Sequence, residues 1–156
     1  MSAREQPPET ITDILERAAE RGRAKGIAYA GLVTPQEAWQ LQSSGAATIV
    51  DVRTRPEWEY VGHVPDSTLI EWRRYGDVAQ NADFLKELAA RFEPDRALLF
   101  LCRSAVRSHH AAAAAAAAGF RQAFNVLEGF EGEIDAQGQR GARGGWRKAG
   151  LPWRQS

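Results

Sequence analysis

The stretch ALLFLCRSAVRSHHAAAAAAAAG, residues 97–119, decides the fold class of this chain. It begins with five consecutive apolar residues, a pattern typical of a buried strand with helices on both faces of its sheet. It ends in eight consecutive alanines before Gly119. Alanine has the highest helix propensity, and glycine commonly ends a helix. We therefore predict a strand over 97–101 and a helix over 108–118, joined by a loop that begins at Cys102.

The rest of the chain repeats this alternation of strand and helix. Short β-branched or apolar runs predict strands at 47–52, 68–70 and 123–127. Helical spacing of apolar residues, together with capping residues, predicts helices at 11–26, 35–44, 54–62 and 84–92. Such a pattern indicates an α/β domain with a mostly parallel sheet, in which functional groups gather at the carboxyl ends of the strands. Cys102 stands at such an end.

The charge and cysteine content exclude several classes of protein. Among 156 residues, 20 Lys and Arg balance 20 Asp and Glu, so the chain is not built to coat nucleic acid or an acidic membrane. Its single cysteine excludes an intramolecular disulfide framework and a multi-thiolate metal site. Charged residues interrupt the N-terminal region, and no apolar run approaches the roughly 20 residues of a membrane span. We therefore expect a cytoplasmic protein without nucleic-acid or membrane partners.

Residues 102–108, CRSAVRS, carry the chemistry. A loop that opens a helix can direct successive backbone N–H groups at one centre, and the positive end of the helix dipole adds to their attraction for an anion. Arg103 and Arg107 add positive charge, so the Cys102 thiol should ionise readily to the nucleophilic thiolate. The alternative is that Cys102 is a buried small apolar residue, the commoner fate of a free cysteine. Local chemistry alone leaves both interpretations open.

Four segments together resemble the rhodanese family of sulfurtransferases: DVR at 51–53, GHVP at 62–65, CRSAVRS at 102–108 and GWRKAGLP at 145–152. The resemblance spans approximately residues 31–153. It implies a five-stranded rhodanese-like sheet. It also implies that Cys102 accepts a sulfane sulfur as a persulfide and passes it to a thiophilic acceptor. No metal and no organic cofactor are implied.

The resemblance and the local charges together suggest roles for the residues around Cys102. The remaining residues of the loop are expected to bind the sulfur donor. Asp51 and Arg53 are expected to support the loop. The donor-binding residues are Arg103, Ser104, Ala105, Val106, Arg107 and Ser108. The expected partners are a small anionic donor such as thiosulfate, a thiol or cyanide as acceptor, and a protein sulfur carrier as a further candidate. We expect residues 1–30 to form an N-terminal helical extension and 31–156 the rhodanese-like domain.

Two other functions compete with sulfur transfer. Four residues separate Cys102 from Arg107, whereas related phosphatase-like domains carry five, enough to wrap a phosphate. A persulfide sulfur is a single terminal atom that a tighter ring of N–H donors can surround, so the short loop disfavours a phosphatase or arsenate reductase. The other alternative is a catalytically idle module that binds proteins, with the N-terminal helix as its docking element. The cysteine and both loop arginines argue against it.

Several ion pairs near these motifs have competing assignments. A cation at Arg107 opposes the helix dipole, so we expect an acidic partner, for which Asp51 is a candidate. Asp51 can equally cap the turn at Arg53, and Arg53 can itself pair with Glu57 or Glu59. Many rhodaneses have glycine where this chain has Ala105. If that position needs a positive φ, alanine strains the loop by roughly 1 kcal/mol.

Aromatic and histidine residues complete the list of candidates. Three aromatic residues either line the mouth of the pocket or belong to the core, namely Trp58, Tyr60 and Trp72. His63 follows Gly62 in a turn, where we expect a structural hydrogen bond. Consecutive helical residues point about 100° apart, so His109 and His110 are expected on the helix surface rather than on one metal ion.

Overall fold

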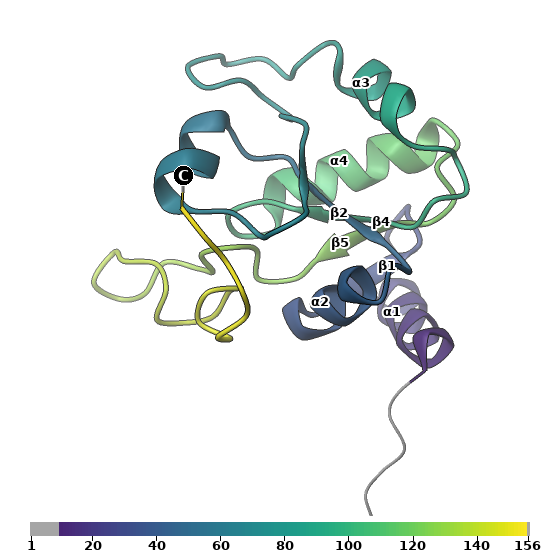
Figure 1. Cartoon of the computed structure of the whole chain (residues 1–156), viewed down its shortest axis with the longest axis horizontal. Coiled ribbons are helices and arrows are strands. Elements are labelled where there is room, and N and C mark those ends of the chain that lie inside the picture. The colour runs from purple at the N-terminus through teal and green to yellow at the C-terminus, as the bar shows by residue number, and fades with distance from the viewer. Residues whose placement is uncertain (1–9, 156) are drawn as a thin grey trace, which may run out of the picture.

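The computed structural model describes residues 10–155, and the five strands of its sheet all run parallel (Figure 1). The strands are β1 (Gly31–Val33), β2 (Thr48–Asp51), β3 (Thr68–Leu69), β4 (Leu98–Leu101) and β5 (Ala123–Val126), in the spatial order β1-β5-β4-β2-β3. The helices are α1 (Ile11–Lys25), α2 (Pro35–Ser43), α3 (Phe84–Arg91) and α4 (Val106–Ala117), with a π-helical turn, η1 (Glu57–Val61). The five-stranded α/β architecture expected from the sequence is therefore confirmed.

Helices cover both faces of the sheet because its strands are apolar on both faces. Figure 1 shows α3 and α4 on one side of the sheet and α1 and α2 on the other. Along β4, Leu99 and Leu101 join the core on the side of α1 and α2, whereas Leu98 and Phe100 join the core under α3 and α4. The alanines of α4 keep that helix narrow, which lets its backbone approach the sheet closely. β4 is thus fixed at the centre of the domain.

Three elements differ from the sequence prediction. β1 spans only three residues at the edge of the sheet, too short to show a strand pattern. α4 begins at Val106, two positions early, because Ala105 adopts the left-handed conformation and acts as its N-cap. The segment after β2 ends in a π-helical turn, an irregularity that is frequent at functional sites.

α1 packs on its own domain. Ile14 and Ala18 are buried in the same apolar cluster as residues of α2 and β4. β1 passes so close to α1 that a Cβ on Gly31 would lie 2.5 Å from the Ala18 carbonyl oxygen. The first nine residues of the expected N-terminal extension, and Ser156, lie outside the described residues.

Glu37 fastens α1 to the start of α2. Its carboxylate accepts hydrogen bonds from Arg17 Nε at 2.8 Å and from Arg21 Nη1 at 2.7 Å, while the Thr34 N–H donates at 2.9 Å. Burial alone would raise the pKa of Glu37. The hydrogen bonds from Arg21, Thr34 and Arg17 outweigh burial and lower that pKa to about 2.

We expect this network to make the fold sensitive to acid. In the folded protein the pKa of Glu37 is about 2, below its ordinary value of 4.5. The Glu37 carboxylate therefore stabilises the folded state fully above pH 4.5, and this contribution disappears as the pH falls toward 2. Urea unfolding should show a loss of about 2–3 kcal/mol over this range. For Glu37→Gln, the free energy of unfolding should change less with pH over this range. If the parent protein shows as small a change as the variant, the prediction is wrong.

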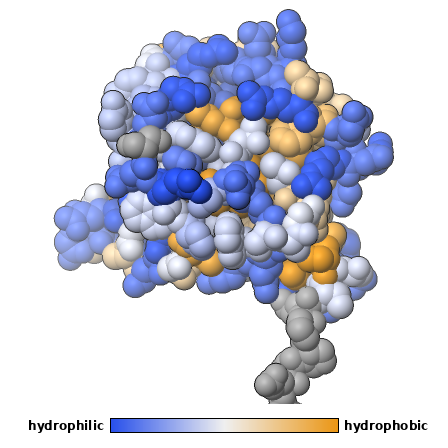
Figure 2. Space-filling view, in the orientation of Figure 1, coloured by the Kyte–Doolittle hydropathy of each residue, from blue (hydrophilic) through white to orange (hydrophobic). Residues whose placement is uncertain are grey.

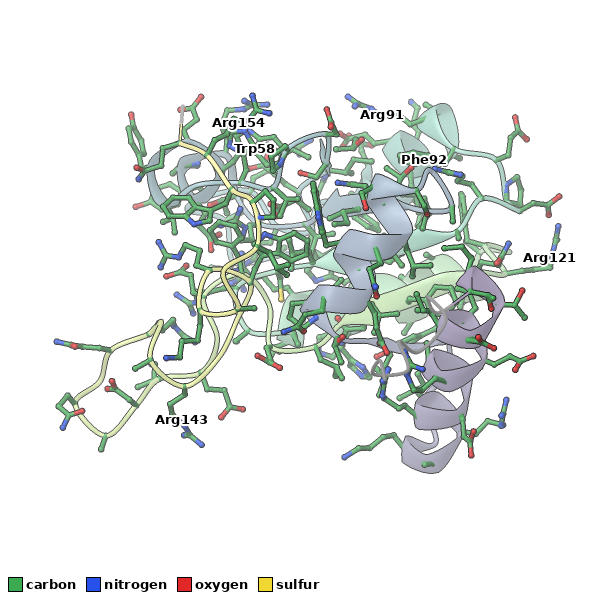
Figure 3. The ribbon with its side chains drawn as sticks, turned by 60° about the horizontal axis from the view of Figure 1, so that its bottom comes forward. Trp58, Arg91, Phe92, Arg121, Arg143 and Arg154 are labelled. Carbon is green, nitrogen blue, oxygen red and sulfur yellow. The ribbon has the colours of Figure 1, made fainter. Side chains whose placement is uncertain are left out.

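The surface is largely hydrophilic on the face that Figure 2 shows, with apolar colour limited to small areas. The segment 133–144 projects from the body of the domain as a loop (Figures 1 and 3). Among residues 10–155, no helix is both long and apolar enough to cross a membrane.

Candidate active site

Cys102 lies where the strand order of the sheet reverses. After β2 the chain moves toward β3 on one side, and after β4 it moves toward β5 on the other. The connections therefore diverge and leave a crevice at the carboxyl ends of β2 and β4, the usual ligand position in an open parallel sheet. Cys102 follows β4 directly, and η1 with Glu57 follows β2.

The loop from Cys102 into α4 leaves a row of hydrogen-bond donors unused. The backbone N–H groups of residues 103–107 donate to no acceptor within residues 10–155. Ala105 adopts φ 79° and ψ 6°, and this left-handed residue turns the loop directly into α4. Unpaired N–H groups at the start of a twelve-residue helix form an anion-binding concavity.

Cys102 sits at the bottom of this loop on a buried polar network. Its side chain is 1% exposed, and its Sγ lies 3.2 Å from Ser108 Oγ. The Ser108 hydroxyl donates to Asn125 Oδ1 at 2.5 Å, and Asn125 Nδ2 donates to the Ala105 carbonyl at 3.2 Å. Asn125 of β5 therefore ties the left-handed loop residue to the serine beneath the thiol. Nothing in the sequence pattern singled out Asn125, because its role depends on the pairing of β5 with β4.

The expected pairing of Asp51 with Arg107 is wrong. Arg107 instead forms a bidentate pair with Glu57, at 2.8 and 3.0 Å. Burial raises the pKa of Glu57, but hydrogen bonds from Arg107 and from the Thr54 N–H reverse this effect and lower it to about 2. Burial lowers the pKa of Arg107, but the hydrogen bonds and the charge of Glu57 outweigh burial, so the pKa of Arg107 is raised. The pair braces α4 against η1, across the crevice.

Asp51 instead pairs with Arg53, the alternative that the sequence left open. Both side chains are fully buried, with Arg53 Nη2 2.7 Å from Asp51 Oδ2. Asp51 also accepts from the Arg53 backbone N–H at 3.0 Å, which closes a turn after β2. Arg53 donates to the Gly62 carbonyl at 2.7 Å and stacks over the Phe130 ring at 4.4 Å. The suggested pairing of Arg53 with Glu57 or Glu59 is therefore wrong, since Asp51 occupies its guanidinium.

The turn at 128–132 supports the cysteine loop from below. The Phe130 N–H donates to the Cys102 carbonyl at 2.8 Å, and the Glu131 N–H donates to the Arg103 carbonyl at 3.0 Å. Gly129 has φ 67°, and a Cβ there would lie 2.4 Å from the Arg103 carbonyl carbon. Only glycine fits both this conformation and this approach.

A pocket of about 350 Å³ opens over Cys102, and its charge is one-sided. Four arginines line it, Arg73, Arg103, Arg107 and Arg140, and no carboxylate of residues 10–155 does. Ser104 and Val106 complete the lining, whereas Ala105 and Ser108 stay outside it. Arg103 is exposed. Arg73 and Arg140 were not anticipated, because only the tertiary fold brings their distant segments to the cysteine.

Trp58, Trp72 and His63 make structural contacts, whereas Tyr60 belongs neither to the core nor to the pocket. Trp72 packs edge-on against Phe84 in the core, and Trp58 stacks on His63 at 4.2 Å. Tyr60 is exposed and lines no pocket around the cysteine. His63 Nδ1 lies 3.2 Å from the Trp58 carbonyl, and its backbone pairs with Arg154, which Figure 3 shows near Trp58. The expected structural hydrogen bond of His63 is confirmed.

The two histidines of α4 differ in exposure: the expected surface position is confirmed for His110, whereas His109 is half-buried. His109 Nδ1 lies 2.7 Å from the hydroxyl of Tyr29, and His110 is exposed. Within residues 10–155, no three His, Cys, Asp or Glu side chains gather closely enough to hold a metal ion.

Ala105→Gly should stabilise the protein. Alanine at φ 79° pays a steric penalty that glycine avoids, so we expect a gain of about 0.5–1 kcal/mol in the free energy of unfolding. Ala114→Gly, inside α4, is the matched control and should cost about 1 kcal/mol. Urea unfolding of both variants checks the prediction, which fails if Ala105→Gly is the less stable protein.

The sequence was compared with those of known protein families. The family described as the rhodanese-like domain matches residues 34–134, which include β2, η1 and the whole cysteine loop. The chain belongs to the rhodanese-like domain family. The C-terminal segment at 145–152 that contributed to the resemblance lies beyond the matched residues of this rhodanese-like chain.

Similar proteins span most of this rhodanese-like chain. The crystal structure of Rv0390 from M. tuberculosis is 47% identical, with a TM-score of 0.72, and the match covers 82% of this chain and 99% of that one. An uncharacterized RP600 homolog of Rickettsia rickettsii is 33% identical over 118 residues, 72% of this chain and 87% of the relative. The thiosulfate sulfurtransferase GlpE of Actinobacillus pleuropneumoniae is a distant homologue, 23% identical over 77% of this chain and 89% of its own length.

Proposed function

We propose that this rhodanese-like protein is a sulfurtransferase that carries a sulfane sulfur on Cys102. The observation that carries the proposal is the pocket over the thiol, which is lined by four arginines and by no carboxylate from the described part of the chain. Positive charge and unpaired N–H donors stabilise a thiolate and, after reaction, a persulfide anion. Distant homology to a thiosulfate sulfurtransferase supports the same chemistry.

In the first half-reaction the Cys102 thiolate attacks the outer sulfur of the donor. A new S–S bond forms at Sγ while the S–S bond of thiosulfate breaks, and sulfite leaves with the bonding electron pair. A persulfide donor reacts in the same way and releases its parent thiolate. The N–H groups of residues 103–107 are the donors available to the charged outer sulfur.

In the second half-reaction an acceptor removes that sulfur. A thiolate or cyanide attacks the outer sulfur, the bond to Cys102 Sγ breaks, and the Cys102 thiolate is restored. Sulfur transfer through one cysteine requires no oxidant and gives ping-pong kinetics. A protein sulfur carrier would use the same step. We assign this chemistry to residues 31–156, with residues 1–30 as an N-terminal extension.

Intact-mass spectrometry after exposure to thiosulfate tests the proposal. The parent protein should gain one sulfur atom, which cyanide should then remove as thiocyanate. Cys102→Ser should gain none. Failure of Cys102 to take sulfur from thiosulfate and from small persulfides would contradict the proposal and favour the idle, protein-binding alternative.

A further inference from the structure

Tyr29 connects the N-terminal segment of the chain to the core around Cys102. It lies between α1 and β1, outside the residues 34–134 that match the rhodanese-like domain. Its side chain is 9% exposed and belongs to the same apolar cluster as Cys102 and the buried alanines of α4. Next to it, the Ala30 N–H donates to the Ala123 carbonyl at 2.9 Å, which fixes this connection against β5. A residue from outside the family-matched region is therefore held beside the active site.

The Tyr29 hydroxyl meets a histidine of α4. Tyr29 Oη lies 2.7 Å from His109 Nδ1, and the two rings pack edge-on with their centroids 5.4 Å apart. Burial raises the pKa of Tyr29, so its hydroxyl keeps its proton at neutral pH. When neutral His109 carries its proton on Nε2, this hydroxyl donates to Nδ1, and its own oxygen can accept a further hydrogen bond.

That oxygen lies beside Asn125, the residue that supports the cysteine loop. A hydrogen bond with the Asn125 side chain lowers the pKa of Tyr29 without cancelling the effect of burial. The Asn125 nitrogen donates to the Ala105 carbonyl, and its oxygen accepts from Ser108. Rotation of this amide group by half a turn would break both contacts. A Tyr29 oxygen that accepts from the Asn125 nitrogen therefore favours the orientation that keeps both.

The cysteine loop depends on this support because residue 105 is alanine. Alanine is sterically strained at φ 79°, so it tends to leave the left-handed conformation unless a neighbour holds it. Asn125 holds the Ala105 carbonyl, at 3.2 Å. Tyr29 and His109 border the same pocket of about 320 Å³ as these two residues. The backbone N–H donors of the loop turn with Ala105, so the orientation of Asn125 governs where those donors point.

We propose that Tyr29 and His109 are positioning residues for sulfur transfer, which act through Asn125. The inference rests on the proposed sulfurtransferase function and assigns two further residues to its first half-reaction. His109 accepts the hydrogen bond of the Tyr29 hydroxyl, and the Tyr29 oxygen then fixes the amide group of Asn125. Neither Tyr29 nor His109 lines the pocket over Cys102, so the network acts on the attack of the thiolate rather than on donor binding.

Single-turnover loading of Cys102 from thiosulfate, followed by intact mass, separates these two effects. Its dependence on thiosulfate concentration gives a maximal rate and the concentration at half-maximal rate. Tyr29→Phe and His109→Leu should each lower the maximal rate about fivefold, because each removes one hydrogen bond. The concentration at half-maximal rate should stay within about twofold of the parental value. The final fraction of loaded protein reports how much of each variant is folded, so slow loading is not confused with unfolding.

Three further variants show whether the two residues act as one unit and through Ala105. The double variant Tyr29→Phe, His109→Leu should load no more slowly than either single variant, because one change already breaks the connection. Asparagine bears an oxygen on the carbon that bears Nδ1 in histidine, so His109→Asn can accept from Tyr29 and should load within about twofold of the parental rate. Glycine adopts φ 79° without strain, so in an Ala105→Gly background Tyr29→Phe should lower the rate less than about twofold.

Tyr60→Phe and His110→Leu are the matched controls. Both side chains are exposed and line no pocket around the cysteine, so both variants should load at the parental rate. If Tyr29→Phe and His109→Leu also load at the parental rate, or change only the concentration at half-maximal rate, the inference is wrong and sulfur transfer stands. Losses that multiply in the double variant overturn it as well, because the two side chains then act separately. If the parent protein takes up no sulfur, the sulfurtransferase proposal fails and this inference fails with it.

Discussion

Gly129→Ala is expected to slow sulfur loading of Cys102 about 100-fold, because misplacing reacting groups by about 1 Å costs that much in rate. A Cβ at this position would lie 2.4 Å from the carbonyl carbon and oxygen of Arg103 and 2.6 Å from the Ser104 nitrogen. All three atoms belong to the backbone of the cysteine loop and cannot swing aside. The loop itself must move, and its N–H donors move with it. Single-turnover loading from thiosulfate, followed by intact mass, measures the effect.

Gly26→Ala separates this clash from ordinary backbone strain. Gly26 has φ 66°, almost the same as the 67° of Gly129, but a Cβ there would meet no atom within 4 Å. Gly26→Ala should lower the free energy of unfolding by about 1–2 kcal/mol, and its rate of sulfur loading at Cys102 should equal that of the parent protein. If both variants load sulfur at the parental rate, the turn at 128–132 does not position the cysteine loop.

The sequence predicted those parts of the fold that depend on local patterns. The apolar runs at 97–101 and 123–127 became β4 and β5, and the capping box at Thr34 opened α2 as expected. β1 escaped detection because three residues at a sheet edge carry too little pattern. Local signals are sufficient where an element has its own periodicity or cap.

The candidate site was only partly predictable, because its geometry depends on contacts between distant segments. The loop residues and the exposure of Arg103 follow from their position between β4 and α4. The pair of Arg107 with Glu57 joins residues 50 positions apart, and no local signal distinguishes Glu57 from Asp51 as the partner. Arg140 lines the same pocket as Cys102 because the segment after β5 packs against the cysteine loop.

These long-range contacts give the site its rigidity. The cysteine loop is held by Asn125 of β5 at its left-handed residue, by the turn after Gly129 at its carbonyls, and by Glu57 at Arg107. Each support comes from a different element at the carboxyl edge of the sheet. A preorganised ring of N–H donors needs such support, because donors that must reorganise during the reaction lose much of their effect.

Asp51→Asn is expected to lower the free energy of unfolding by about 3–5 kcal/mol, since it removes the carboxylate that pairs directly with the buried Arg53 cation. Both side chains are 0% exposed. Asparagine retains an oxygen that can accept from the Arg53 backbone N–H, but its amide nitrogen cannot accept from Arg53 Nη2. The change therefore removes the negative charge and one hydrogen-bond acceptor together. Burial lowers the pKa of Arg53; the charge and hydrogen bonds of Asp51 do most to raise it again, ahead of the charges of Glu57 and Glu131. Urea unfolding at neutral pH measures the loss.

The double variant Asp51→Asn, Arg53→Met decides whether charge is the cause. Methionine fills part of the space of the arginine and can pack on Phe130 without a charge to compensate. Replacing a buried ion pair by uncharged residues is often nearly neutral, so the double variant should recover at least half of the stability lost in Asp51→Asn. Arg53→Met alone completes the comparison. If the double variant loses as much stability as the two single variants together, the pair is not coupled, and the stability here comes from packing around Phe130 rather than from the buried salt bridge.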